Sequence, residues 1–518
     1  MQEKSFMNQI YSNIKAKIRP YWVTAFVSCM VIGLLTYGYL MSNHFLTHDS
    51  MWNLYSDQNM ITSGRQFLQF ACGISSYYDL PWFNGLLAIF YLAITSVLVV
   101  EGLGIRSHIN AALSAGIIVT FPSVISTFGY TYTVDGYMLA GLLAAAAFLI
   151  TDRKKWGCFA GAVLLGIGLG IYQAFLSFAI ILCILRLLLD ILEQINIREI
   201  LMKACRFMAM GAGAYLFYLV TLNLMLAMQG VQLSEYQGVN KVQGVSLSTL
   251  PDGLYAAFMN FMNFARWANV LTTTDPMKWA FVILILLSIC FYVYFFITGK
   301  CYRSPFRIFM VMALVLAIPF GATAVSIISP DTFYHLLLRG SWCLFFVFAL
   351  ALSERFRLTE KKTANRVKQV LTLAVCLFSV ILVFEFSKMA NIVGYNQNER
   401  YEKSYSLCLR LLDRLEQTPG YEAGMPVAIL GGVPANPSTD ITKEDLVGYF
   451  GVNGDYVLGS TQHYAAFMSH YMNITLNTID YEEELNLVET EEFKACPKFP
   501  DKDCIIQING VWVIKING

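Results

Sequence analysis

The sequence predicts an α-helical polytopic membrane protein, and three observations support this fold class. Hydrophobic residues occupy 56% of the 518 positions and charged residues only 14%, whereas soluble globular chains average about 45–50% and 25%. The mean hydropathy is +0.54. Many apolar stretches approach the roughly 20 residues that a helix needs to cross a bilayer. The balance of 36 Lys and Arg against 35 Asp and Glu excludes a basic nucleic-acid-binding protein.

We predict eleven transmembrane segments, whose limits follow the apolar stretches. The first is too long for a cleaved signal peptide and lacks a cleavage site of small residues. The predicted segments cover residues 22–42, 83–101, 108–127, 133–151, 157–171, 173–190, 206–228, 278–298, 307–328, 340–353 and 369–389.

The distribution of Lys and Arg between the loops predicts the orientation. One alternating set of loops contains 21 of these residues and the opposite set contains 5. Loops rich in Lys and Arg remain on the cytoplasmic side. Residues 1–21 are therefore predicted to be cytoplasmic. An odd number of segments then places residues 391–518 outside, after a transmembrane domain that covers 22–390.

Two long loops are predicted on the outer side, at 43–82 and 229–277. Within the second loop, apolar residues between Leu250 and Ala268 recur at helical spacing. Such an amphipathic segment predicts a helix that lies in the membrane interface.

The C-terminal segment reads as a small extracytoplasmic α/β domain. We predict a helix over 399–417, a buried strand at Val427–Leu430 and a closing hairpin. Asn509-Gly510 between the two hairpin strands is a favoured two-residue turn. The twelve cysteines show no metal-binding spacing. Cys496 and Cys504, in a polar segment, are the one pair for which a disulfide is considered.

Ionisable residues in the first outer loop are the main candidates for function. Asp49 follows the first segment, and Asp57 and Arg65 come at successive intervals of eight residues. An ordinary polar loop would also contain acids. The loop, however, is rich in Trp and Tyr, which indicates that it lies at the membrane interface.

Further candidates lie at the outer ends of other predicted segments. Tyr132 and Asp135 lie beside the fourth segment, where Asp135 as a helix N-cap or first-turn acid is the alternative. Tyr172 and Gln173 are at a predicted hairpin tip. The glycines of the preceding GIGLGIYQ are interpreted as helix-packing contacts, because no strand precedes them.

His335 and Arg339 lie four residues apart near the tenth segment, which would place them on one face of an α-helix. A cation on the outer side opposes the positive-inside bias. We interpret the pair as an anion site for a lipid phosphate, with a snorkelling interfacial arginine as the alternative.

One acid and scattered arginines suit sugar transfer from a lipid phosphate better than glycoside hydrolysis. Hydrolysis usually needs two carboxylates, because a sugar alkoxide leaves poorly without an acid. A phosphate leaves as a stable anion, so one base for the acceptor hydroxyl is enough. Cations would hold the departing phosphate. Displacement from the opposite face would invert the anomeric centre.

Several stretches carry a family resemblance, among them HDSMWNLYSDQ, SGRQF, ACGISSYYDLPW, FPSVISTFGYTYTVDGY and GIYQAFLSF. They resemble the membrane glucosyltransferase family of O-antigen serotype conversion, over roughly residues 20–390. The most specific element is the acid-containing first loop that ends in Gly64-Arg65-Gln66-Phe67. Two positions depart from the family pattern, with Gln66 where Trp is usual and His48 where an acid often precedes the Asp.

The resemblance implies a GT-C fold enzyme of the bacterial plasma membrane. It would move a hexose, glucose in the family, from undecaprenyl phosphate to a cell-surface glycan such as O-antigen or teichoic acid. A polyprenyl-phosphate sugar synthase would make the donor, and a small flippase would carry it across the membrane lipid. No nucleic acid is involved.

The same resemblance implies roles for three residues. Asp49 would be the general base, Asp57 a supporting acid or acceptor contact, and Arg65 a donor-phosphate contact. Asp135, His335 and Arg339 are added from their positions alone. The chemistry requires no metal or other cofactor, and a divalent ion that bridges Asp49 and the phosphate is the alternative.

Other functions of multispan proteins remain as alternatives. A transporter or flippase of lipid-linked glycans should show internal repeats and charges near mid-membrane, whereas the ionisable residues here cluster at the outer edge. A surface-glycan polymerase would carry its functional arginines in later loops. A non-enzymatic scaffold would leave the interfacial acid unexplained.

Overall fold

The computed structural model describes residues 17–44, 47, 49–235, 250–267, 274–330, 335–356, 362–432 and 458–516. Most of the predicted cytoplasmic N-terminus, parts of the predicted loop 229–277, and His48 lie outside these residues.

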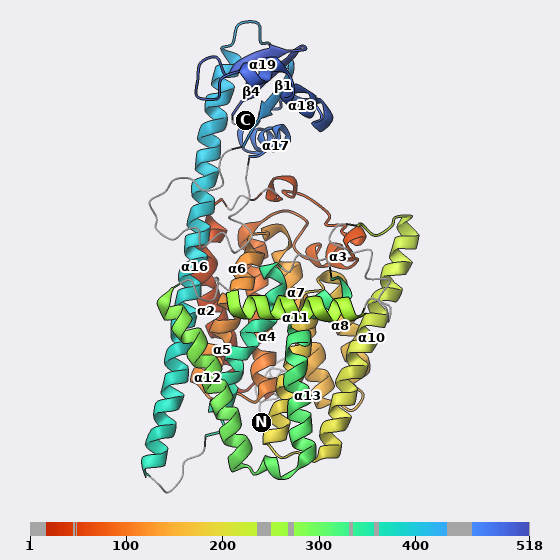
Figure 1. The fold of residues 1–518 in the computed structure, drawn as a ribbon, viewed down its shortest axis with the longest axis vertical. Helices are drawn as coiled ribbons and strands as arrows, with labels where there is room; N and C mark the ends of the chain where they lie inside the picture. The colour runs from red at the N-terminus through yellow and green to blue at the C-terminus, as the bar shows by residue number, and fades with distance from the viewer. Residues whose placement is uncertain are drawn as a thin grey trace, which may run out of the picture.

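The described chain is mainly a bundle of apolar helices with a small α/β domain at one end (Figure 1). This confirms the predicted fold class, a polytopic GT-C-like membrane protein. Nine helices of the described part are long and apolar enough to cross a membrane. They are α2 (Pro20–Ser42), α4 (Pro81–Leu103), α7 (Thr131–Arg153), α9 (Phe175–Leu192), α10 (Ile197–Gln229), α12 (Asp275–Thr298), α13 (Pro305–Ala322), η6 with α15 (Leu336–Trp342, Cys343–Ser353) and α16 (Lys362–Glu416).

Two further predicted segments take other forms. The prediction of one continuous segment at 108–127 is wrong, because α5 (His108–Thr120) and α6 (Pro122–Phe128) are bent by 46°. Pro122 begins α6 and Phe121 before it is extended, as expected of the residue before a proline. The helix α8 (Gly157–Ile171) has 15 residues, or about 22 Å at 1.5 Å per residue.

Burial divides the bundle into an inner and an outer layer. Most residues of α4, α7, α9 and the η6–α15 segment are buried within the protein. By contrast, in α2, α10, α12, α13 and α16 no more than a third of the residues are buried within the protein, and the others are partly or fully exposed. In a membrane protein these exposed side chains face lipid, so the outer layer needs no protein partner to cover it.

Helix α11 (Leu250–Trp267) lies across the bundle, roughly perpendicular to the spanning helices (Figure 1). This agrees with the predicted interfacial helix, whose last predicted residue lies outside the described part. The predicted segment 307–328 is interrupted at Thr323, between α13 and α14 (Ala324–Ile328). The Thr323 hydroxyl donates to the Ala257 carbonyl of α11 at 2.8 Å, so the interruption fixes α11 to the bundle.

The helix predicted at 399–417 is present up to Glu416, but it is the continuation of the last membrane segment and not a separate element. Helix α16 runs without a break for 55 residues, from the opposite end of the bundle into the C-terminal domain (Figure 1). The polar stretch after the membrane segment contains no proline. It is supported by contacts between Asn398 and Glu402 and between Glu399 and Lys403, which have the i,i+4 spacing of helix neighbours.

The C-terminal domain contains a four-stranded sheet in the order β2-β1-β4-β3. Strand β1 pairs in parallel with β2 and β4, and β3 pairs antiparallel with β4. Asn509 and Gly510 have φ values of 52° and 85°, so the predicted hairpin turn is present. Cys496 and Cys504 are free thiols. The elements are β1 (Pro426–Leu430), α17 (Thr461–Met472), β2 (Asn477–Thr478), α18 (Tyr481–Val488), α19 (Glu491–Ala495), β3 (Ile505–Ile508) and β4 (Val511–Lys515).

Alternate strand residues build two cores on the two faces of this sheet. Val427, Ile429 and Ile514 pack with the end of α16 and with α17. Ala428, Leu430 and others on the opposite face pack with residues of α18 and α19. The sheet therefore lies between two helical layers, as expected of a strand pattern that is apolar on both faces.

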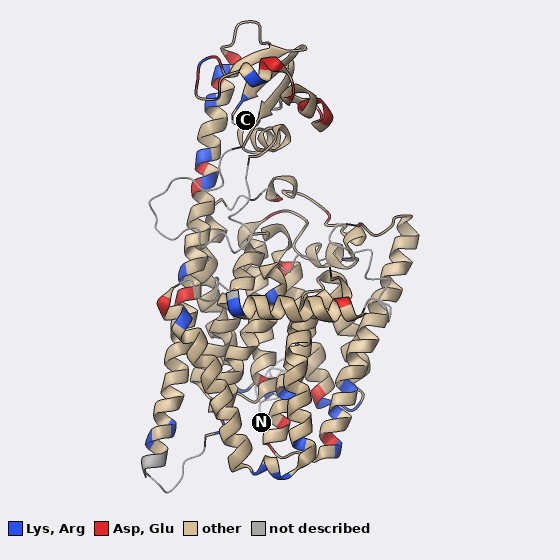
Figure 2. Ribbon diagram, in the orientation of Figure 1, with Lys and Arg blue, Asp and Glu red and all other residues tan. Residues whose placement is uncertain are grey.

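Charged residues gather at the two ends of the bundle and on the C-terminal domain, and few lie between them (Figure 2). One end carries the C-terminal domain, and we call it the domain end. The opposite end contains η5 (Cys301–Arg303) and the loops that join α4 to α5, α7 to α8 and α9 to α10.

Candidate active site

The loop between α2 and α4, residues 43–80, covers part of the domain end. Its described part contains η1 (Ser50–Trp52), η2 (Ile61–Ser63) and α3 (Leu68–Cys72). Two extended pieces of the loop pair with each other, since Ser56 donates to the Tyr77 carbonyl at 3.1 Å and Asp79 donates to that of Leu54 at 2.9 Å. This pairing holds the second half of the loop against the part that follows Asp49.

Arg65 is positioned by hydrogen bonds from the bundle to its neighbours in the chain. Gly64 is left-handed, with φ of 71°, and its carbonyl accepts from Gln173 at 2.7 Å and Tyr218 at 3.0 Å. Phe67 donates to the Gly170 carbonyl at 2.8 Å. A Cβ on Gly170 would lie 2.4 Å from the Phe67 ring, so only glycine allows this approach. Gln173, a predicted substrate contact, thus holds the loop in place.

The Arg65 guanidinium lies against aromatic rings. Its Nη1 donates to the Tyr137 hydroxyl at 2.9 Å, and its central carbon lies 5.2 Å from the Tyr172 ring centre. These two rings stack on each other at 4.1 Å. Among the described residues, no carboxylate forms an ion pair with Arg65, and its Nε has no hydrogen-bond partner. The rings stabilise the cation without neutralising it, which leaves Arg65 suited to an anion.

Asp49 and Asp79 both lie within electrostatic range of the Tyr132 hydroxyl on α7. Tyr132 also acts on Arg65, together with three other tyrosines. Tyr132 is therefore the shared neighbour of the two acids and the cation. The predicted residues Asp49, Arg65, Tyr132 and Tyr172 thus belong to one region of the domain end.

Asp79 was not among the residues that the sequence predicted for the site. Burial raises the pKa of its carboxyl group to about 6, and its Oδ1 has no hydrogen-bond partner among the described residues. A carboxylate with a pKa close to neutral can take and return protons. The sequence did contain a signal for Asp79. It lies two residues before Pro81, near the end of the loop, just as Asp49 lies near the beginning of the loop.

The other two predicted acids, Asp57 and Asp135, make different contacts. Asp57 is exposed and accepts hydrogen bonds from Asn59 at 3.1 Å and Gln69 at 3.2 Å. Asp135 is fully buried in the second turn of α7, so it is neither an N-cap nor a first-turn acid. It faces Ser75 and Cys72 of the α2–α4 loop, beneath the surface on which a substrate would bind.

The expectation that His335 and Arg339 share one helical face is wrong. The segment is a 3₁₀-helix with a kink at Arg339, and His335 is its N-cap. In a 3₁₀-helix, residues three apart align and residues four apart do not. The Arg339 guanidinium lies 4.3 Å from the Phe264 ring centre and donates to the Asn260 carbonyl at 3.2 Å. Both contacts are with α11.

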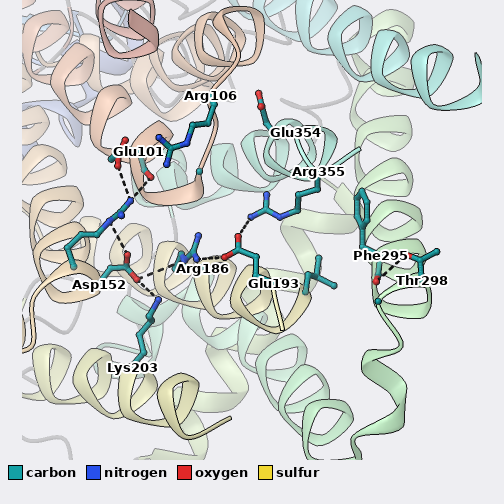
Figure 3. Close-up of a pocket in the computed structure, with 14 residues that line it drawn as sticks. Glu101, Arg106, Asp152, Arg186, Glu193, Lys203, Phe295, Thr298, Glu354 and Arg355 are labelled. Carbon is teal, nitrogen blue, oxygen red and sulfur yellow. Dashed lines mark hydrogen bonds and ion pairs between the residues drawn. The ribbon is translucent and has the colours of Figure 1, made fainter. Parts of the chain in front are cut away.

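A polar cavity of about 1010 Å³ lies at the opposite end of the bundle (Figure 3). Lys203 contacts Asp152 at 2.7 Å and the fully buried Asp190 at 2.6 Å. Arg186 contacts Asp190 and Glu193. Further lining residues include Glu101, Arg106, Arg153, Glu354 and Arg355. Glu101, Asp152, Asp190 and Glu193 all form ion pairs with Lys or Arg here, so this cluster fastens helix ends together.

Comparison with protein families identifies a match over a large part of the chain. The family model described as Glucosyl transferase GtrII matches residues 38–338. That range is more than half of the chain. The chain belongs to this family. No curated protein and no solved structure shows detectable similarity.

Membership in the GtrII family makes the protein a membrane glycosyltransferase. The matched range includes the α2–α4 loop, with Asp49, Arg65 and Asp79, and the start of α7 with Tyr132. It ends before Arg339 and before the C-terminal domain. Among the described residues, no group of three His, Cys, Asp or Glu side chains is arranged to hold a metal ion.

Proposed function

We propose that the protein transfers a hexose, glucose, from undecaprenyl phosphate to a cell-surface polysaccharide on the outer face of the bacterial membrane. Membership in the family supports the transfer of glucose. The undecaprenyl phosphate donor and the outer face of the membrane are proposed here. One observation carries the proposal. Arg65, which forms no ion pair with a carboxylate of the described part, contacts Tyr137 and Tyr172, and two acids, Asp49 and Asp79, act on Tyr132 of the same helix as Tyr137.

This combination of one cation and two acids suits an inverting displacement. Arg65 binds the phosphate of the donor and stabilises the negative charge that develops as the phosphate leaves. Asp49 accepts the proton of the attacking acceptor hydroxyl. Asp79 accepts a hydrogen bond from the acceptor and orients it. With an acid to activate the acceptor and a cation to hold the departing phosphate, attack opposite the phosphate inverts the anomeric centre.

The distribution of charge supports an outer location of the site. Lys and Arg are abundant in the loops at the opposite end, and the α2–α4 loop contains only Arg65. By the positive-inside rule, the opposite end faces the cytoplasm and the domain end faces outward. A polyprenyl-phosphate sugar synthase and a small flippase would then deliver the donor to the outer leaflet. Asp135 and His335 would contribute at most to the shape of the site.

The test uses the full chain in lipid vesicles with glucosyl-phosphoryl-undecaprenol labelled in the sugar. The acceptor is surface polysaccharide extracted from cells that lack the protein. We expect label to enter the polysaccharide through a bond of inverted configuration. Transport of the labelled lipid across the bilayer without a new glycosidic bond would indicate a flippase. Extension of the polysaccharide by whole repeat units would indicate a polymerase.

A further inference from the structure

The C-terminal domain has a direct connection to the α2–α4 loop. Met51, two residues after Asp49, is fully buried, and it belongs to the core of the C-terminal domain. That core also contains Leu411 and Leu415 of α16, Ile429 of β1 and Phe467 of α17. A buried methionine at this place contributes about 2 kcal/mol or more to the association of the two parts.

Aromatic contacts extend this connection on both sides of Met51. His44 stacks on Tyr401 of α16 at 3.8 Å and meets the edge of Tyr471 at 5.9 Å. The ring of Trp52 lies 6.1 Å from that of His463 on α17. The Trp52 side chain remains 51% exposed. It is therefore held beside the domain but still offers a free indole face.

The acids of the candidate site are on the side of the C-terminal domain. The charge of Asp79 acts on the Tyr471 hydroxyl, and burial raises the pKa of Tyr471 to about 12. The four tyrosines that act on Arg65 all belong to α7, α10 and the α8–α9 turn. The C-terminal domain thus lies within electrostatic range of Asp79 and packs on Met51, two residues after the proposed base, and it contributes none of these four tyrosines.

In an inverting displacement the acceptor approaches from the side of the base, opposite the leaving phosphate. We infer that the C-terminal domain forms the acceptor-binding wall of the active site, with Met51 as a positioning residue and Trp52 and His463 as the surface that contacts an acceptor sugar. This inference rests on the proposed function. An exposed indole gives a flat apolar face to a pyranose ring, and neighbouring polar groups bind its hydroxyls.

The experiment measures transfer from glucosyl-phosphoryl-undecaprenol to extracted surface polysaccharide, with either substrate varied. We expect Trp52→Ala to raise the KM for polysaccharide by about tenfold, which corresponds to about 1.4 kcal/mol. The KM for the donor and the slow transfer of glucose to water should stay unchanged. Trp52→Tyr should restore most of the acceptor binding. Tyr481→Ala, on the far helical layer and 67% exposed, is the matched control and should behave as the wild type.

Met51 is tested separately, because its loss could loosen the domain. Met51→Ala should lower kcat and raise the KM for polysaccharide, with the donor KM unchanged, and Met51→Leu should restore both. Limited proteolysis after α16 reports whether the domain has detached. An unchanged acceptor KM in Trp52→Ala, with active wild type, overturns the inference alone. A wild-type protein that transfers no sugar from this donor overturns the proposed function instead.

Discussion

Asp49 and Met51 are two residues apart, and their side chains belong to different parts of the molecule. The Asp49 charge acts on Tyr132 of the bundle, whereas Met51 is buried in the core of the C-terminal domain. The proposed base therefore lies at the junction of the two parts. A change in either part can therefore alter its position relative to the donor.

Asp49→Asn should lower kcat by about a hundredfold or more, because the amide cannot accept the proton of the acceptor hydroxyl. Donor binding should survive, since Arg65 is unchanged. Single-turnover transfer and equilibrium binding of the labelled donor measure the two effects. Asp413→Asn, an exposed acid on α16, serves as the control. Near-wild-type turnover of the Asp49 variant would remove this residue from the mechanism.

Arg65→Ala should raise the KM for the donor about tenfold or more, the usual loss for a hydrogen bond to a charged group. Arg65→Lys should recover only part of it, since an ammonium lacks the planar face that stacks on Tyr172. Arg106→Ala is a matched control, because Arg106 also lies over a tyrosine ring, at 5.4 Å, but at the opposite end. An equal effect of both variants would contradict a phosphate site at Arg65.

The ionisation of Asp79 should produce the acid limb in the pH profile of kcat/KM for polysaccharide. Its pKa is raised to about 6, and the ionised form binds the acceptor. The value of kcat/KM for polysaccharide should therefore rise as the pH increases through about 6. Asp79→Asn should remove the limb. A limb that persists in this variant would assign it to another group.

The raised pKa of Asp79 also affects stability. Between about pH 4 and 6 the folded protein binds more protons than the unfolded chain, so the free energy of unfolding falls over that interval as pH rises.

Arg339→Ala distinguishes two roles for an arginine that contacts α11. If Arg339 binds the donor phosphate, the variant should need more donor for half-maximal transfer, and we expect this result. Its hydrogen bond to Asn260 of α11 also predicts a modest fall in thermal stability. Asn260→Ala keeps the carbonyl that accepts from Arg339 but removes the side-chain bond from α11 to Ser326 at 3.0 Å, so it shows the effect of a loosened α11 with Arg339 intact. Lower stability with unchanged donor dependence would reduce Arg339 to an anchor of α11.

Lys203→Met should destabilise the protein by about 3 kcal/mol, because it leaves the fully buried Asp190 with less compensation. The double variant Lys203→Met with Asp190→Asn should recover part of the loss. Thermal unfolding in detergent measures both, and the KM for the donor should not change. A large change in donor KM would mean that the polar cavity at the opposite end takes part in transfer.

The helices and the first-loop residues could be predicted because each depends on local sequence. Apolar stretches of sufficient length form helices in a membrane wherever they occur, since their backbone groups can be satisfied only internally. Asp49 and Arg65 were identifiable as rare ionisable residues beside such stretches. The positions of the breaks were less predictable. The bend before Pro122 follows from a local rule, but the unbroken course of α16 depends on its packing against α2 and the C-terminal domain.

Asp79, Met51 and the kink at Arg339 required the structure. Asp79 becomes a candidate because folding buries its carboxyl group, and no local pattern reports burial. Met51 looks like one more apolar residue in an interfacial loop, and only the fold shows that it is part of another domain. His335 and Arg339 were expected on one face because an α-helix was assumed, and the 3₁₀ geometry changed their relation.

The sequence by itself determined that the chain crosses the membrane many times and that acids and an arginine follow the first crossing. The length, hydrophobicity and charge of a segment are local properties, so they can be read directly from the sequence. Only the tertiary structure decided which acid lies near which cation, and which domain covers them. Those relations depend on contacts between residues hundreds of positions apart, such as Met51 and Phe467, whose free energy is gained only when the whole chain has folded.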